Sequence, residues 1–231
     1  MNKIKNIAII PARGGSKRIP RKNMKIFLGK PIIAYSIEAA IKSGLFDDVM
    51  VSTDDEEIAK IAKKHGAKVP FMRSAKASDD FATTADVLIE VLSEYKNKGT
   101  EFEHFCCIYP TAPFVTSEKL QESFLNLKQN NFDAVFPVVK FSYPIQRALK
   151  IKNSKVSMIE PENMQKRSQD LMDAFHDAGQ FYFMKTKLFL LNKEIFTDNT
   201  GAIELSELEV QDIDNETDWQ IAEMKYKLQN G

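Results

Sequence analysis

The chain of 231 residues lacks the features of several common functional classes. Lysine plus arginine and aspartate plus glutamate each number 32, so the net charge is zero. The basic excess expected of a general nucleic-acid or membrane-surface binder is therefore missing. No apolar run approaches the length of a membrane span, and the run at residues 7–10 is too short for a secretory signal. We expect no nucleic-acid partner and no membrane partner.

Cysteine is scarce, and the two that occur, Cys106 and Cys107, are adjacent inside an apolar run. Neighbouring residues of a strand point to opposite faces of a sheet, which disfavours a disulfide between them. The sequence also has no CxxC pattern of the kind that binds zinc. We expect buried, reduced cysteines and a cytoplasmic location.

The most informative segment follows the apolar run at 7–10 and reads Pro-Ala-Arg-Gly-Gly-Ser-Lys-Arg-Ile-Pro-Arg-Lys-Asn over residues 11–23. Its paired glycines permit a sharp turn whose N–H groups can face an anion. The spacing matches neither a Walker A loop nor a dinucleotide fingerprint. Arginine and lysine side chains bind phosphates, and five such cations occur here: Arg13, Lys17, Arg18, Arg21 and Lys22. The segment predicts a nucleoside triphosphate site; the alternative is a solvated basic loop.

The alternation of apolar runs with helical patterns predicts an α/β fold, a mostly parallel sheet covered by helices. Strands are expected at 4–10, 49–53, 68–72, 105–109, 134–139 and 181–184. Helices are expected at 31–43, from a cap at Asp54 to 65, from a cap at Thr83 or Thr84 to 95, from a cap at Ser117 to 129, and at 216–228. Ligands bind where parallel strands end, so the loop after the first strand, the stretch after Met72 and the turn after Tyr109 should share one edge.

The alternation stops between residues 140 and 170. Residues 150–158 predict two short strands around an Asn-Ser turn. An exposed hairpin of this size does not bury its apolar face alone. It is either an association surface or a flap over the substrate.

Two carboxylates precede the last predicted helix, at Asp212 and Asp214. In an extended segment, residues two apart point to the same side, so both can face one cation. Mg²⁺ typically takes one or two carboxylates together with phosphate oxygens and water. Taken alone, the pattern favours a helix cap at Asp214 with a solvated Asp212, because acidic residues are common before helices. Next to the predicted phosphate loop, the same pair also suits a magnesium site.

The basic segment resembles the signature of the acylneuraminate cytidylyltransferase family, and Lys17 to Asn23 is most similar to its pseudaminic acid branch. The resemblance covers nearly the whole chain. It implies one Rossmann-like nucleotidyltransferase domain over 1–231, whose insertion at 140–170 packs against a second subunit in a homodimer. It also implies a reaction in which CTP and an acidic nine-carbon sugar, pseudaminic acid, give a CMP-sugar and pyrophosphate. The product would serve glycosylation of a bacterial surface structure such as flagellin.

The same resemblance implies the residues of the site. Arg13, Lys17, Asp212 and Asp214 are expected to be catalytic, the two aspartates through Mg²⁺. The expected substrate-binding residues are Arg13, Gly14, Gly15, Ser16, Lys17, Lys22, Asn23, Arg73, Asp80, Thr83, Thr84, Pro110, Thr111, Arg147, Arg167, Gln169, Gly179 and Gln180. Many sugar nucleotidyltransferases carry a metal-binding aspartate in the turn at 110–113, and this chain does not.

Other assignments stay open from the sequence. The same reaction could use N-acetylneuraminic, legionaminic or 3-deoxy-octulosonic acid. A catalytically silent nucleotide-binding protein would also keep the basic loop. His176 is interpreted as a structural residue bonded to a neighbour such as Asp177, rather than as a general base.

Overall fold

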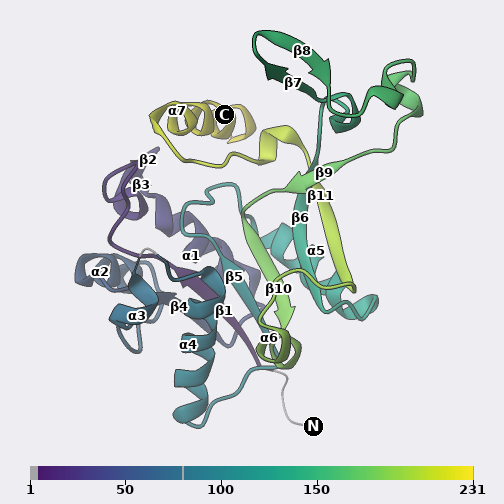
Figure 1. Cartoon of the computed structure of the whole chain (residues 1–231). Coiled ribbons are helices and arrows are strands. Elements are labelled where there is room, and N and C mark those ends of the chain that lie inside the picture. Colours follow the sequence, from purple (N-terminus) through teal and green to yellow (C-terminus); the bar gives the residue numbers. More distant parts are fainter. Residues whose placement is uncertain (1–4, 80, 231) are drawn as a thin grey trace.

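A central sheet of seven strands organises the computed structural model, which describes residues 5–79 and 81–230 (Figure 1). The strand order is β11-β6-β10-β5-β1-β4, with β9 beside β6. The sheet strands are β1 (Asn6–Pro11), β4 (Asp48–Ser52), β5 (His104–Ile108), β6 (Ala134–Lys140), β9 (Phe175–Asp177), β10 (Phe181–Lys185) and β11 (Thr200–Leu205). Short hairpins are formed by β2 (Ile26–Phe27) with β3 (Lys30–Pro31), and by β7 (Leu149–Lys152) with β8 (Lys155–Met158).

Most of the sheet is parallel, which confirms the predicted fold class. β1 runs parallel to β4 and to β5, and β6 runs parallel to β11. β10 is antiparallel to both β5 and β6, so it joins two parallel groups that point the same way. The carboxyl ends of β1, β4, β5, β6 and β11 therefore lie at one edge, where β10 begins.

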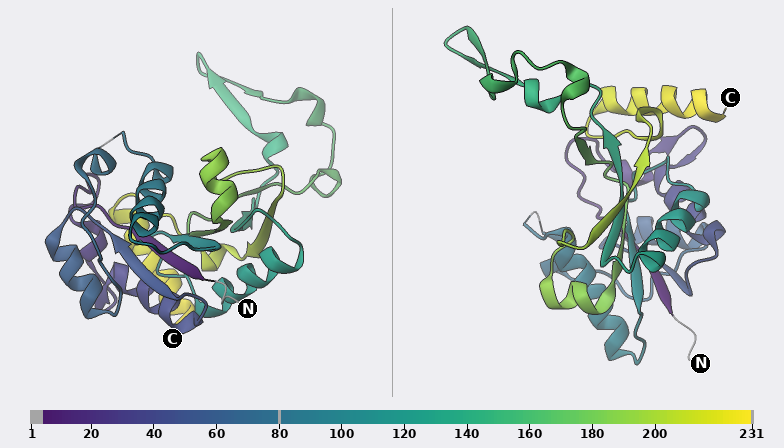
Figure 2. Two further views of the ribbon diagram at one scale, coloured as in Figure 1. Left: turned by 90° about the horizontal axis from the view of Figure 1, so that it is seen from below. Right: turned by 90° about the vertical axis from the view of Figure 1, so that its right-hand side faces the viewer.

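Helices cover both faces of this sheet (Figure 2). The helices are α1 (Ile32–Ser43), α2 (Glu56–Lys64), α3 (Ala75–Ser78), α4 (Thr84–Asn97), α5 (Ser117–Gln129), α6 (Thr186–Asn192) and α7 (Glu216–Asn230). Apolar side chains of α1, α2 and α5 share one core cluster with Cys106, and those of α4 and α6 share another with Cys107. Both cysteines are free and buried, on opposite faces as predicted.

Three local predictions are wrong, for identifiable reasons. Asp55, not Asp54, caps α2, because the Asp54 carboxylate accepts a hydrogen bond from the Gly14 N–H instead. Thr116, not Ser117, caps α5. The strand expected at 68–72 is reduced, in the described part of the chain, to a bridge between Lys68 and Met50; Pro70 has no N–H with which to extend a ladder. The Thr83 cap of α4 is confirmed.

The predicted hairpin is confirmed as β7–β8, and it projects with its flanking segments from the end of β6 (Figures 1 and 2). Asn153 and Ser154 both have positive φ, 50° and 61°, as a tight hairpin turn requires. Leu149, Ile151 and Val156 are 61%, 75% and 61% exposed. In the described residues, no helix is both long enough and apolar enough to span a bilayer.

An aromatic cluster docks α7 onto the start of the chain. The Phe27 ring packs edge-on against Tyr35, Trp219 and Tyr226 at centroid distances of 5.5, 5.6 and 5.6 Å. Ile213, just before α7, is buried in the same cluster. The cluster therefore fixes the segment that carries Asp212 and Asp214.

Replacing Phe27 with alanine should lower the free energy of unfolding by about 3–5 kcal/mol, because a fully buried ring and its edge contacts are lost. Ile26→Ala is the matched control. Its side chain is 57% exposed, and its effect should stay within about 0.5 kcal/mol. Urea unfolding of both variants measures the difference; equal effects would contradict this packing account.

Candidate nucleotide site

Two adjoining cavities lie at the edge where the parallel strands end. The larger, about 390 Å³, is lined by Pro11, Arg13, Ser16, Lys17, Arg18, Ile19, Lys22, Asn23, Pro110 and Thr111. The smaller, about 270 Å³, is lined by Pro11, Arg13, Arg73, Ala77, Asp79, Ala82, Thr83, Thr84, Val87 and Tyr109. Because Pro11 and Arg13 belong to both, one extended ligand can occupy the two cavities together. The larger cavity carries most of the positive charge.

The loop after β1 is held by acceptors at the end of β4. The Ala12 N–H donates to the Ser52 carbonyl at 2.9 Å, and the Gly14 N–H donates to the Asp54 carboxylate at 2.9 Å. Asn23 is buried, and its side-chain amide donates to the Arg13 carbonyl at 2.9 Å. Asn23, a predicted substrate-binding residue, lines the larger cavity, and its observed contact orients the loop that carries Arg13.

The two glycines of this loop differ in what surrounds them. A Cβ at Gly14 would lie 2.8 Å from an oxygen of Asp55, so this position has no room for a side chain. A Cβ at Gly15 would have no heavy atom of the described residues within 4 Å. Gly14 is therefore required by the packing of the loop against α2, whereas a side chain at Gly15 would meet open space. Neither glycine is among the residues that line the two cavities.

The structure separates the basic side chains that the sequence grouped together. Arg21 adopts a left-handed backbone and turns away from the cavities, with its guanidinium 3.2 Å from Asp55 and 2.7 Å from Glu57. Lys22 points toward the end of the chain and donates to the Ile213 carbonyl at 2.5 Å. Burial lowers the pKa of the Lys22 ammonium, while nearby carboxylates oppose that shift.

Asp214 contacts two of the cations that line the larger cavity, and Asp212 lies two residues before it in the chain. Ile213 is 1% exposed and points into the core, so its two neighbours point the other way. The charges of both carboxylates oppose the lowering of the Lys22 pKa by burial. Asp214 is 2.5 Å from Arg18 and 3.9 Å from Lys22.

The carboxylates of Asp212 and Asp214 can hold Mg²⁺ only when a bound ligand supplies further oxygen atoms. The described residues contain no cluster of three or more histidine, cysteine, aspartate or glutamate side chains that could hold a metal. Two carboxylates beside a phosphate-sized cationic cavity still match the usual magnesium arrangement, in which substrate phosphates and water complete the coordination.

Arg73 and the start of α4 form the wall of the smaller cavity. The Arg73 side chain is 8% exposed and donates to the Ser52 hydroxyl at 3.0 Å and the Ser52 carbonyl at 2.5 Å. Burial lowers its pKa, and the charge of Asp54 opposes the shift. Thr83 caps α4 with its hydroxyl, and Thr84 begins the helix. Asp80 lies outside the described residues.

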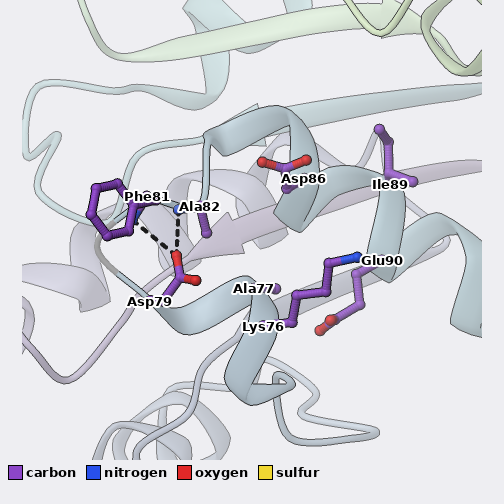
Figure 3. A pocket seen from close by; sticks show the side chains of 8 residues that line it. All are labelled: Lys76, Ala77, Asp79, Phe81, Ala82, Asp86, Ile89 and Glu90. Atoms are coloured by element: carbon purple, nitrogen blue, oxygen red, sulfur yellow. Dashed lines mark hydrogen bonds between the residues drawn. The ribbon is translucent and has the colours of Figure 1, made fainter.

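A further cavity of about 370 Å³ shares Ala77, Asp79 and Ala82 with the smaller one (Figure 3). The Asp79 carboxylate accepts hydrogen bonds from the N–H groups of Phe81 and Ala82, at 2.9 and 2.7 Å (Figure 3). Phe81 is 91% exposed. This cavity is therefore the outer side of the loop that walls the smaller cavity, shaped by local turn contacts.

Gly179 and Gln180 lie at the same edge, where β10 starts. Gly179 has φ of 63°, a left-handed conformation that suits glycine, and its N–H donates to Asp177 at 2.8 Å. The buried Gln180 amide donates to the Glu209 carbonyl at 2.7 Å, and its Oε1 has no partner among the described residues. Gln180 thus connects the sheet edge to the segment that leads to Asp212.

Three predicted substrate-binding residues lie outside the two cavities. Arg147, near Ser168, and Arg167, paired with Asp170, belong to the projecting insertion. Gln169 lines a separate cavity at the base of that insertion. In the described structure, none of the three lines either cavity of the nucleotide site. The single chain does not bring them to the other predicted residues, because the insertion projects away from the sheet.

Sequence reasoning missed three residues that shape the site: Arg18 as a partner of Asp214, Asp54 as the acceptor for Gly14, and Tyr109 as a wall of the smaller cavity. Tyr109 directly follows β5 and precedes the turn at Pro110. Its position at a strand end was a usable signal.

A family model described as cytidylyltransferase matches residues 7–227. The chain belongs to the cytidylyltransferase family. A pseudaminic acid cytidylyltransferase of Campylobacter jejuni is 44% identical to this cytidylyltransferase over 226 residues, covering 97% of each chain. A CMP-N,N'-diacetyllegionaminic acid synthase of Legionella pneumophila is 30% identical and covers 96% of each chain.

The fold of this cytidylyltransferase is also found in solved structures. CMP:2-keto-3-deoxy-manno-octonic acid synthetase in complex with CTP matches with a TM-score of 0.69 and 17% identity, covering 97% of this chain and 99% of the other. The family resemblance, the Rossmann-like fold and the class of CTP-dependent sugar nucleotidyltransferase are confirmed.

Gly14→Ala and Gly15→Ala should separate loop packing from ligand binding. We expect Gly14→Ala to lower stability by about 1–3 kcal/mol, because the new methyl group overlaps Asp55. Gly15→Ala should leave the thermal midpoint unchanged and weaken CTP binding. Thermal unfolding and calorimetric titration with CTP measure the two effects; a midpoint lowered equally in both variants would show that this contrast is wrong.

Proposed function

We propose that the chain transfers CMP from CTP to pseudaminic acid and releases pyrophosphate. The observation that carries this proposal is the pair of cavities joined at Arg13, one rich in cations and one walled by Arg73 and the start of α4. Their location where the parallel strands end is the usual ligand position in such sheets. The 44% identity to a pseudaminic acid cytidylyltransferase supports the choice of sugar.

The cavity chemistry suggests how CTP lies. The triphosphate occupies the larger cavity, where Arg13, Lys17 and Lys22 supply positive charge. The cytosine and ribose occupy the smaller cavity beside Arg73 and the first turn of α4. Arg13, which lines both, then lies next to the α-phosphate.

The reaction needs positioning and charge more than a covalent intermediate. The anomeric oxygen of the sugar attacks the α-phosphorus and forms a new P–O bond, and its proton is released to water. The bond from that phosphorus to the oxygen bridging to the β-phosphate breaks, and pyrophosphate leaves with the electron pair. Lys17 and Lys22 stabilise the negative charge that develops on the leaving group. Loop contacts through Asn23 and Asp54 keep Arg13 in place.

Asp212 and Asp214 would hold a Mg²⁺ ion. When bound, this ion would polarise the α-phosphate and lower the pKa of the attacking hydroxyl. The role of the chain itself would be to present both carboxylates to the cationic cavity, and the burial of Ile213 between them supports this assignment.

The insertion gives the proposal a second part, a homodimer. Its hairpin exposes Leu149, Ile151 and Val156, and a second copy of the chain would cover them. Arg147, Arg167 and Gln169, which are distant from the cavities of their own chain, would then be available to an acidic sugar near the subunit interface. We place the enzyme in the cytoplasm, where the CMP-sugar serves glycosylation of a surface structure such as flagellin.

The direct test incubates the purified chain with CTP, Mg²⁺ and, in parallel, pseudaminic, N,N'-diacetyllegionaminic and N-acetylneuraminic acid. Pyrophosphate and a CMP-sugar should appear with pseudaminic acid at a kcat/KM well above the others. Preference for another sugar would keep the chemistry and contradict the substrate. Failure to release pyrophosphate with any acidic sugar would favour a silent nucleotide-binding protein.

Asp214→Ala should lower kcat by about 10²–10³-fold, the size expected when a group that stabilises transition-state charge is lost. The fold should survive, because the side chain is 37% exposed. Glu216→Ala, which removes a neighbouring exposed carboxylate paired with Lys25, is the control and should retain activity. Turnover near the wild-type value in Asp214→Ala would remove the metal assignment.

A further inference from the structure

Arg18 lines the larger cavity, but its guanidinium is bonded to a carboxylate. Its Nη1 lies 2.5 Å from Oδ2 of Asp214. The Arg18 side chain is 68% exposed and that of Asp214 is 37% exposed. This ion pair joins the basic loop to the segment expected to hold Mg²⁺.

Asp214 is held at the start of α7, and each of its carboxylate oxygens has a cation nearby. Its backbone N–H donates to Asp218 at 2.9 Å, which sets its position at the start of α7. Oδ2 contacts Arg18, and Oδ1 lies 3.9 Å from the Lys22 ammonium. Lys22 is anchored separately by the Ile213 carbonyl. Arg18 has no second polar anchor among the described contacts, so it is the cation that can leave.

A divalent cation and the Arg18 guanidinium need the same oxygen of Asp214. They compete for its lone pairs, and their like charges repel each other. An ion pair this exposed is only weakly stable, so displacing it costs little. Once displaced, the long Arg18 side chain still borders the cavity, where the triphosphate of CTP is the nearest anion. Guanidinium groups bind phosphate through two parallel hydrogen bonds.

We propose that Arg18 occupies Asp214 in the metal-free chain and moves to the phosphates of CTP when a divalent cation binds. This inference rests on the proposed function, and it adds a device that links cation binding to nucleotide binding. Because binding linkage is reciprocal, CTP must then tighten the binding of the cation as much as the cation tightens the binding of CTP.

Arg21 provides a matched control in the same loop. It is also an arginine, and its guanidinium contacts Asp55 and Glu57 at the start of α2 rather than Asp214. Removing its charge changes the basic character of the loop by the same amount as removing that of Arg18. A difference between the two variants therefore reports the contact with Asp214 and not net charge.

The experiment uses the full-length chain and Mn²⁺ as a probe, with free Mn²⁺ measured by electron paramagnetic resonance. Wild type, Arg18→Met and Arg21→Met are titrated with and without CTP, and without sugar, so that no turnover occurs. Without CTP, Arg18→Met should bind Mn²⁺ about two- to fivefold more tightly than wild type, the range that an exposed ion pair allows. The increase in Mn²⁺ affinity caused by CTP should be smaller in Arg18→Met than in wild type. Arg21→Met should match wild type in both measurements.

The outcomes also separate this inference from the proposed function. Equal or weaker Mn²⁺ binding by Arg18→Met, or an unchanged effect of CTP, overturns the role of Arg18. Asp214→Ala serves as the reference for the metal site. If Asp214→Ala binds Mn²⁺ more weakly than wild type but Arg18→Met binds it as wild type does, the metal site stands and the proposed movement of Arg18 is wrong. If Asp214→Ala binds Mn²⁺ as tightly as wild type does, the metal site at Asp214 and the movement of Arg18 are both wrong.

Discussion

The site depends on the contact between the basic loop near the start of the chain and the segment before the last helix. Lys22 donates to the Ile213 carbonyl across 191 residues of sequence. Ile19 and Ile213 are both buried in the aromatic cluster around Phe27. Polar and apolar contacts thus act together, and they bring the carboxylate of Asp214 to Arg18 and Lys22.

The sheet determines where this contact occurs. Because β10 runs against its neighbours, its first residues reach the same edge as the ends of β1, β4 and β5. Gln180 then connects that edge to Glu209, and Asp177 holds both the Gly179 turn and the Tyr182 hydroxyl, the latter at 2.6 Å. These hydrogen bonds fix the Gly179 turn against β10, which suits catalysis by positioning.

Much of this could be predicted from the sequence, because the strongest patterns are local. The basic loop, the helices α1, α4 and α7 and the extended Asp212–Asp214 segment follow from periodicity, caps and spacing. The sequence could not show that Arg21 turns away from the cavities while the other basic side chains of the loop line them. Its direction depends on its left-handed backbone and on the acidic start of α2, which lie together only in the folded chain. The sequence likewise predicts Asp54 as the cap of α2, because its contact with the Gly14 N–H exists only in the folded chain. The sequence analysis does not predict β9, β11, α3 or α6. Three of these elements, β9, α3 and α6, are short, whereas β11 has a regular alternation of buried and exposed residues that is typical of a strand.

The central claim is that one CTP molecule spans the two cavities joined at Arg13. A crystal structure of the chain with a non-hydrolysable CTP analogue tests it most directly. The account predicts the cytosine ring beside Arg73 and the first turn of α4, and the phosphates beside Lys17 and Lys22. A nucleotide bound in the opposite direction, or outside both cavities, would contradict it.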